Sequence, residues 1–123
     1  MPTPLVISWF KQPEDHNYPA AASYLGLIYD AKTVKRLVAS LKKARMSAFK
    51  AKDIFRASGL SLLGVSNFHV IKNKAKIEVG KQLSPLLLVR DTVHGKVIVA
   101  DGYHRLCAVY TLDEDVLIPC KIV

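Results

Sequence analysis

The stretch VIVADGYHRLCAVYTL, residues 97–112, does most to decide the expected fold of this chain. Its first part is an apolar run that ends at Asp101 and Gly102, a pattern typical of a buried strand. Residues 103–112 then place apolar side chains at the spacing of a helix. The stretch therefore predicts a strand that turns into a helix through a glycine, with tyrosine, histidine and arginine at the turn.

The sequence on either side extends this prediction to a whole domain. Four prolines within residues 1–19 favour an extended arm and loop. The expected helices cover residues 20–30, 30–47, 50–59 and 103–112, with a short basic helix within 60–82, and the expected strands cover 85–91, 96–101 and 116–123. Asp30 or Thr33 is a candidate cap for the second helix. We expect one α+β domain over residues 1–123, with a helical, basic N-terminal part in 1–66.

Composition limits the class of protein. The chain has 123 residues, of which 50% are apolar, which is a globular rather than a disordered composition. No apolar run approaches the roughly 20 residues of a membrane helix, and the start lacks the pattern of a signal peptide. We therefore expect a cytoplasmic protein with no membrane contact. Cys107 and Cys120 are too few for a disulfide framework or a structural zinc site and are expected in the core.

The positive charge is concentrated in residues 31–76, which carry twelve Lys or Arg and one acid, Asp53. Such a region can attract nucleic acid or nucleotide phosphates, or it can be a solvated lysine-rich helix face. Within it, residues 52–66 resemble a DNA-binding helix-turn-helix, although Phe55 and Gly64 depart from that pattern. DNA binding through residues 31–76 is therefore one functional hypothesis.

The turn at Gly102 supplies the other hypothesis. A helix that begins directly after a strand leaves N–H groups without partners at the positive end of its dipole, where phosphates bind. Arg105 can give two parallel hydrogen bonds to a phosphate, and His104 can give another. Asp101 could cap the helix, hold the arginine or contact a magnesium ion. The alternative is a merely structural helix start in which Asp101 is the cap.

Residues 67–123 also resemble the ParB/sulfiredoxin superfamily. The similarity lies in an ordered set over residues 83–123: a strand after proline, a turn, a second strand that ends in Gly-x-x-Arg, a helix, and the closing strand VLIPCKIV. Gly102 and Arg105 match the Gly-x-x-Arg frame. Upstream, NFHV keeps the asparagine of an Asn-Pro-Arg box and places His69 where the arginine stands in ParB-like proteins.

This resemblance implies a small mixed sheet packed by helices and a nucleotide site at the turn. The ligand would be ATP or another nucleoside triphosphate with Mg²⁺, and the expected binding residues are His69, Lys72, Lys74, Gly102, Tyr103, His104 and Arg105. Sulfiredoxins carry their nucleophilic cysteine where this chain has Tyr103, which argues against sulfinic-acid reduction. Free-serine kinases carry an Asp-Gly-His-x-Arg-like motif, so phosphoryl transfer to a small hydroxyl acceptor is possible, with Asp101 and His104 as catalytic candidates. The oligomeric state stays open.

Overall fold

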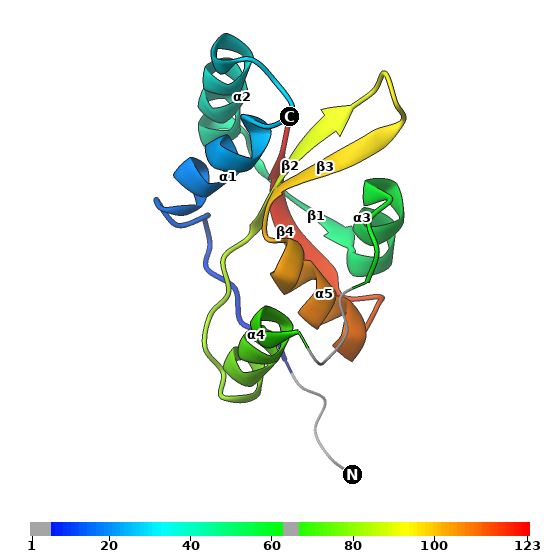
Figure 1. Cartoon of the computed structure of the whole chain (residues 1–123). Helices are drawn as coiled ribbons and strands as arrows, with labels where there is room; N and C mark the ends of the chain where they lie inside the picture. The colour runs from blue at the N-terminus through cyan, green and yellow to red at the C-terminus, as the bar shows by residue number, and fades with distance from the viewer. Residues whose placement is uncertain (1–5, 63–66) are drawn as a thin grey trace.

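Within residues 6–62 and 67–123, which the computed structural model describes, the chain forms five helices and one four-stranded mixed sheet (Figure 1). The strands are β1 (Met46–Lys50), β2 (Leu86–Asp91), β3 (Lys96–Asp101) and β4 (Leu117–Ile122). They lie side by side in the order β1-β4-β2-β3, with β4 antiparallel to β1 and parallel to β2, and β2 antiparallel to β3. The predicted α+β class is confirmed.

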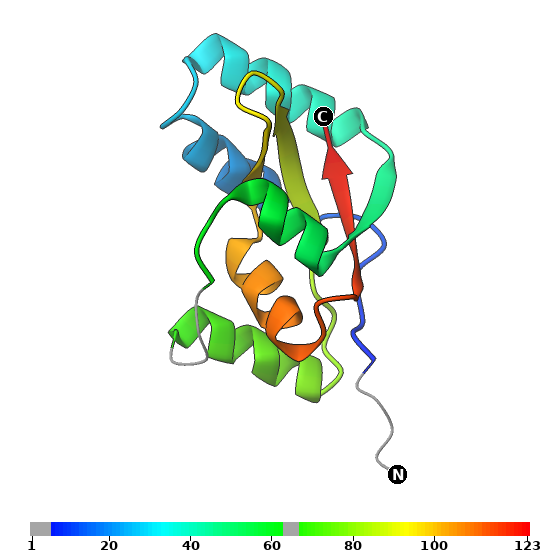
Figure 2. The same cartoon turned by 90° about the vertical axis from the view of Figure 1, so that its right-hand side faces the viewer.

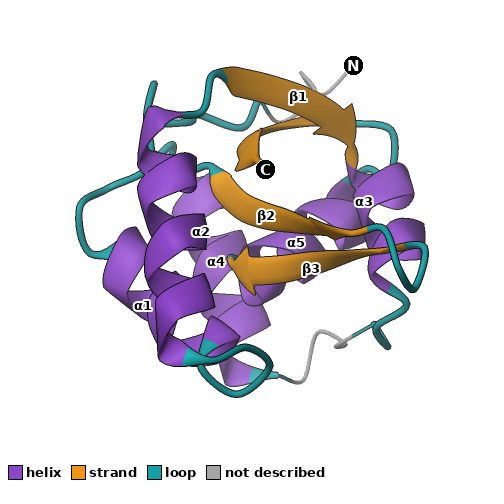
Figure 3. Ribbon diagram, turned by 90° about the horizontal axis from the view of Figure 1, so that it is seen from above, coloured by secondary structure: helices purple, strands orange, loops and turns teal. Residues whose placement is uncertain are grey.

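Helices cover both faces of the sheet because its central strand β2 is apolar on both sides. The helices are α1 (Asn17–Leu25), α2 (Ala31–Lys43), α3 (Ala51–Ser58), α4 (Phe68–Glu78) and α5 (Tyr103–Leu112). Leu87 and Val89 pack with α1 and α2, whereas Leu86 and Leu88 belong to the core that α3, α4 and α5 build on the other face. Figure 3, which looks along the molecule from above, shows α1 and α2 at one side of the strands and α3 at the other. The continuous apolar run is what a strand buried on both faces requires.

Two predicted helix boundaries near the N-terminus are wrong. The helix expected over 20–30 begins at Asn17 and ends at Leu25, so the end of the predicted arm is helical. Pro19 lies in the first turn, where its missing N–H is not needed. The helix expected over 30–47 ends at Lys43. Its predicted cap is confirmed at Asp30, whose carboxylate accepts a 2.7 Å hydrogen bond from the Thr33 N–H.

The residues after that helix form β1, so the prediction of a helical N-terminal part needs correction. Met46 pairs with Lys121 and Lys50 with Leu117 along the edge of β4. Most of β1 is exposed, and its side chains show no alternation of apolar and polar types. Edge strands of this kind are held by backbone pairing to a neighbour distant in sequence, which local periodicity does not reveal.

The segment that resembles a helix-turn-helix begins with α3, which ends as predicted at Gly59 in the left-handed conformation (φ +66°). Residues 60–62 are not helical, and residues 63–66 lie outside the described residues. Phe55 stacks on Tyr110 of α5, with ring centroids 4.9 Å apart. In the described residues, α3 therefore packs against α5 rather than against a second helix of such a motif.

The strands and helices expected in residues 85–112 are formed within one residue of their predicted bounds. α4 packs against α5, at the opposite end of the molecule from α2 (Figure 2). Both cysteines are fully buried, as expected, and burial raises the pKa of the Cys120 thiol to about 11. None of the helices in the described part of the chain has the length and apolarity needed to cross a bilayer.

Candidate functional site

The turn between β3 and α5 is shaped by Gly102, which has φ +108°. A Cβ at this position would lie 2.8 Å from Leu86 Cγ and 2.9 Å from Arg105 Nη2. Both the backbone angle and the close approach require glycine. The pairing of β2 with β3 also shifts by one residue directly before this turn, between Leu87 and Leu88. Such irregularities change the direction of the strand next to a site.

Asp101 and Arg105 form an ion pair across the turn, with 3.0 Å between Asp101 Oδ2 and Arg105 Nη2. The two side chains are only 16% and 17% exposed. Arg105 Nη2 also lies 3.5 Å from the Pro85 carbonyl oxygen, while its Nε is buried without a hydrogen-bond partner. Of the three roles open to Asp101, the structure selects holding the arginine. It does not cap α5, which begins at Tyr103 after the N-cap residue Gly102 and has no side-chain cap.

One face of α4 stands opposite this turn and closes a polar hollow of about 210 Å³. The hollow is lined by Asp101, Gly102, Tyr103, His104 and Arg105 from the turn and by His69, Lys72, Asn73 and Lys76 from α4. The sequence predicted seven of these nine residues as site residues. The structure brings His69, Lys72 and the residues of the turn together although 29 or more positions separate the two α4 residues from the turn in the chain.

Lys74, which the sequence also predicted as a binding residue, is not among the side chains that line the hollow. Sequence reasoning missed Lys76 and Asn73. Positions 69, 72, 73 and 76 follow the i, i+3, i+4, i+7 spacing of one helix face, on which position 74 does not fall. The Asn67 side chain fixes the start of α4, because it accepts hydrogen bonds from the His69 and Val70 N–H groups. With that start known, the helical spacing could have identified Asn73 and Lys76.

Two histidines meet inside the hollow, His69 from α4 and His104 from α5, with ring centroids 4.6 Å apart. Burial lowers the pKa of His104, and the nearby His69 and Arg105 lower it further. His104 therefore holds a neutral imidazole at neutral pH, able to accept a proton. Burial, with Cys107 nearby, raises the pKa of Tyr103, so its hydroxyl stays protonated.

The charges of the hollow suit an anion. Lys72, Lys76 and Arg105 are three cations, and Asp101 is the one carboxylate that lines it. The first N–H groups of α5 add their partial positive charge at the same place. The volume of about 210 Å³ is below the roughly 300–1,000 Å³ of pockets that enclose a drug-sized molecule. The hollow therefore fits phosphate groups, and a nucleoside attached to them would lie outside it.

A resident magnesium ion does not fit this donor set. Asp101 is already paired with Arg105, and no cluster of three or more His, Cys, Asp or Glu within residues 6–62 and 67–123 could hold a metal. Magnesium ions in nucleotide sites usually combine one or two carboxylates with phosphate oxygens. Any Mg²⁺ at this hollow would therefore depend on a bound polyphosphate for most of its ligands.

Comparisons of the chain with protein-family models, with curated proteins and with solved structures find no match. The case for a function therefore rests on the geometry of the hollow and on the sequence resemblance described above.

Proposed function

We propose that this protein binds the phosphate groups of a nucleotide in the hollow between the start of α5 and the exposed face of α4. The observation that carries the proposal is the charge arrangement: three cations and an uncapped helix start face a space lined by one carboxylate. Phosphates bind helix starts and arginine forks of this kind. The ParB/sulfiredoxin resemblance supports the same ligand class, a nucleoside triphosphate such as ATP.

Each side chain has a distinct part in this proposal. Lys72 and Lys76 neutralise phosphate charge from the α4 side. Arg105 donates through its free N–H groups while Asp101 fixes its guanidinium, and His104 supplies one further donor. A phosphate that draws Arg105 toward itself competes with Asp101 for the same guanidinium. The ion pair is thus both a positioning contact and a limit on affinity.

If turnover occurs, phosphoryl transfer to a small hydroxyl acceptor is the reaction class we propose. His104 is the proton acceptor of choice, because its lowered pKa keeps the imidazole neutral and proton-accepting at neutral pH. Asp101 is less suited to remove a proton while it is bound to Arg105. Release of ³²P-phosphate from γ-labelled ATP, or transfer of its γ-phosphoryl group to serine or glycerol with ADP as the leaving group, would distinguish an enzyme from a binding module.

Isothermal titration calorimetry tests the binding proposal directly. ATP, CTP, GTP and inorganic pyrophosphate are titrated into the protein with and without Mg²⁺, and at least one is expected to bind. Arg105→Ala should weaken binding by more than tenfold, since a hydrogen-bonded charge contributes about 1.5–3 kcal/mol. Arg56→Ala is the matched control, because the Arg56 side chain is 86% exposed on α3 and does not line the hollow. Binding to none of the four ligands would overturn the proposal.

Duplex DNA binding by residues 31–76 is the second candidate, and one observation favours it. α2 exposes five cations on the molecular surface: Lys32, Lys35, Arg36, Lys42 and Lys43. The cations of α4 lie at the other end of the molecule, so residues 31–76 do not present one continuous basic surface (Figures 1 and 2). A mobility shift whose affinity falls steeply between about 50 and 200 mM salt would support DNA binding. Loss of that shift in Lys35→Glu/Arg36→Glu would assign it to α2.

A further inference from the structure

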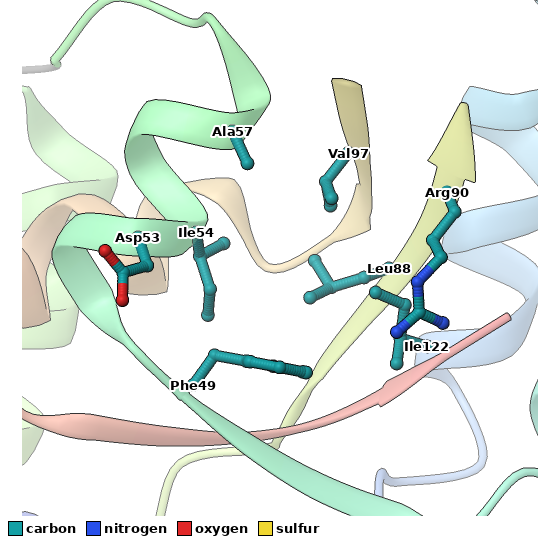
Figure 4. A pocket seen from close by; sticks show the side chains of 8 residues that line it. All are labelled: Phe49, Asp53, Ile54, Ala57, Leu88, Arg90, Val97 and Ile122. Carbon is teal, nitrogen blue, oxygen red and sulfur yellow. The ribbon is translucent and has the colours of Figure 1, made fainter. Parts of the chain in front are cut away.

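A second hollow lies on the same face of the sheet, beneath α3. Its volume is about 240 Å³. It is lined by Phe49, Asp53, Ile54, Ala57, Leu88, Arg90, Val97 and Ile122, which are mostly apolar (Figure 4). None of these residues lines the polar hollow at the start of α5. The two hollows are therefore separate sites.

This apolar cavity exists because the helices leave one end of the sheet open. Leu88 is paired with Ile122 across the parallel strands, and Arg90 with Val97 across the hairpin. Leu88, Val97 and Ile122 therefore form an apolar floor beside Arg90. α3 stops at Ser58 and contributes Ile54 and Ala57 as one wall. Phe49 of the edge strand β1 forms another part of the lining and is 37% exposed. The small Ala57 side chain leaves the space unfilled.

Arg90 gives the cavity a single directed charge. Its guanidinium extends from β2 toward Ile122 at the border of the cavity (Figure 4). Among the described residues it forms no salt bridge. The other ionic group of the lining, Asp53, turns its carboxylate away from Leu88 and Val97 and lies 3.6 Å from Arg56. A ligand in the cavity would therefore meet apolar walls and one cation that has no partner in this part of the chain.

We propose that this cavity binds a small carboxylate with an apolar body, such as an aromatic ring on a one- or two-carbon acid. A cavity of about 150 Å³ lined by apolar side chains is known to hold benzene. The space of about 240 Å³ accommodates a ring and a short acid. The ring contacts Ile54, Leu88 and Ile122, and the carboxylate accepts hydrogen bonds from the Arg90 guanidinium. Burial of the ring supplies most of the affinity, because an ion pair to an exposed arginine adds little.

Methyl NMR of the full chain tests this proposal with phenylacetate as the probe and phenylacetamide, its neutral amide of the same size, as the comparison. Phenylacetate is expected to shift the methyl signals of Ile54, Leu88, Val97 and Ile122 in a saturable way. Its affinity should exceed that of phenylacetamide about two- to fivefold, the range of a solvent-exposed ion pair. In Arg90→Gln this preference should fall below twofold, with the fold preserved because the Arg90 side chain is exposed.

Ala57→Leu provides the matched block of the cavity. The leucine suits a helix and fills the space, so neither probe should shift the methyl signals of this variant. Ala20→Leu is the control, at an exposed position of α1 on the other sheet face, and it should bind both probes like the parent. No saturable shift at the four residues, or unchanged shifts in Ala57→Leu, would overturn the site. Equal affinity for the acid and the amide would overturn the carboxylate assignment.

Discussion

The two hollows of this protein are nearly equal in size, about 210 and 240 Å³, and opposite in chemistry. β3 connects them, because Val97 near its beginning lines the apolar cavity and Asp101 at its end lines the polar hollow. Four steps along a strand separate these two residues by about 13 Å. The difference arises from the helix that faces each end of the strand: α4 presents histidine and lysines, and α3 presents isoleucine and alanine. One sheet thus supports two kinds of surface without sharing a residue between them.

The largest expected change in stability concerns the Gly102 turn of the polar hollow, because the apolar cavity has no comparable turn in its lining. Gly102→Ala should lower the free energy of unfolding by about 2–4 kcal/mol, because a left-handed φ and a Cβ 2.8 Å from Leu86 Cγ act together. Gly95→Ala is the control, since Gly95 has φ +63° but nothing within 4 Å of an added Cβ, and about 1 kcal/mol is expected. Urea unfolding measures both. Equal losses would mean that close packing at Gly102 contributes nothing.

The polar hollow was largely predictable from sequence because its turn is contiguous. Asp101 to Arg105 follow one another, and the apolar pattern on both sides fixes the strand and the helix that hold them. To predict the opposite wall, the start of α4 has to be known, because it fixes which helix face lines the hollow. Without that start, the sequence predicted Lys74 and missed Lys76. The apolar cavity was not predicted, because its lining comes from five elements and consists of ordinary core residue types. β1, which supplies Phe49, was itself missed because backbone pairing to β4 creates that strand.

Removing the charge of Asp101 from its ion pair with Arg105 should lower stability but raise the affinity for pyrophosphate. Asp101→Asn should lower the free energy of unfolding by about 1–3 kcal/mol, because the partly buried Arg105 guanidinium loses its anionic partner. The same change should strengthen pyrophosphate binding severalfold, because Arg105 becomes free to turn to the ligand. Thermal unfolding and calorimetry measure the two effects. Weaker binding would instead give Asp101 a direct part in the site.

That outcome can be separated from a general loss of structure. Asp91→Asn removes a carboxylate that pairs with His94 at the hairpin, 2.8 Å away, outside both hollows. It should leave pyrophosphate affinity unchanged. A comparable gain in both variants would point to the overall charge rather than to the Asp101–Arg105 pair.

Acidification should affect the polar hollow through His104. Its pKa in the folded protein is lowered, so the unfolded chain takes up a proton first as the pH falls below the ordinary value of about 6.5. Stability is therefore fully present above that pH and declines as the pH falls toward the lowered pKa. Between pH about 7.5 and about 5.5, the free energy of unfolding of the parent should fall more than that of His104→Gln, which urea unfolding at each pH measures.

A bound anion should reverse this trend, because it favours the protonated imidazole. Sulfate is the suitable probe, since phosphate itself changes charge near pH 6. The affinity for sulfate should rise as the pH falls in the parent and stay nearly flat in His104→Gln. A rise of the same size in the variant would show that His104 is not the group responsible for the pH dependence.

The smallest expected effect belongs to the apolar cavity in the absence of any ligand. Ala57→Leu should raise the free energy of unfolding by about 0.5–1 kcal/mol, because it buries new apolar surface against Leu88 and Val97. Ala20→Leu, at an exposed position of α1, should change stability by less than about 0.5 kcal/mol. A destabilised Ala57→Leu would mean that the walls cannot receive a larger side chain, and the cavity would then be too rigid or too small for an aromatic acid. A stabilised variant would mean that the protein keeps this cavity open at a cost to its own stability.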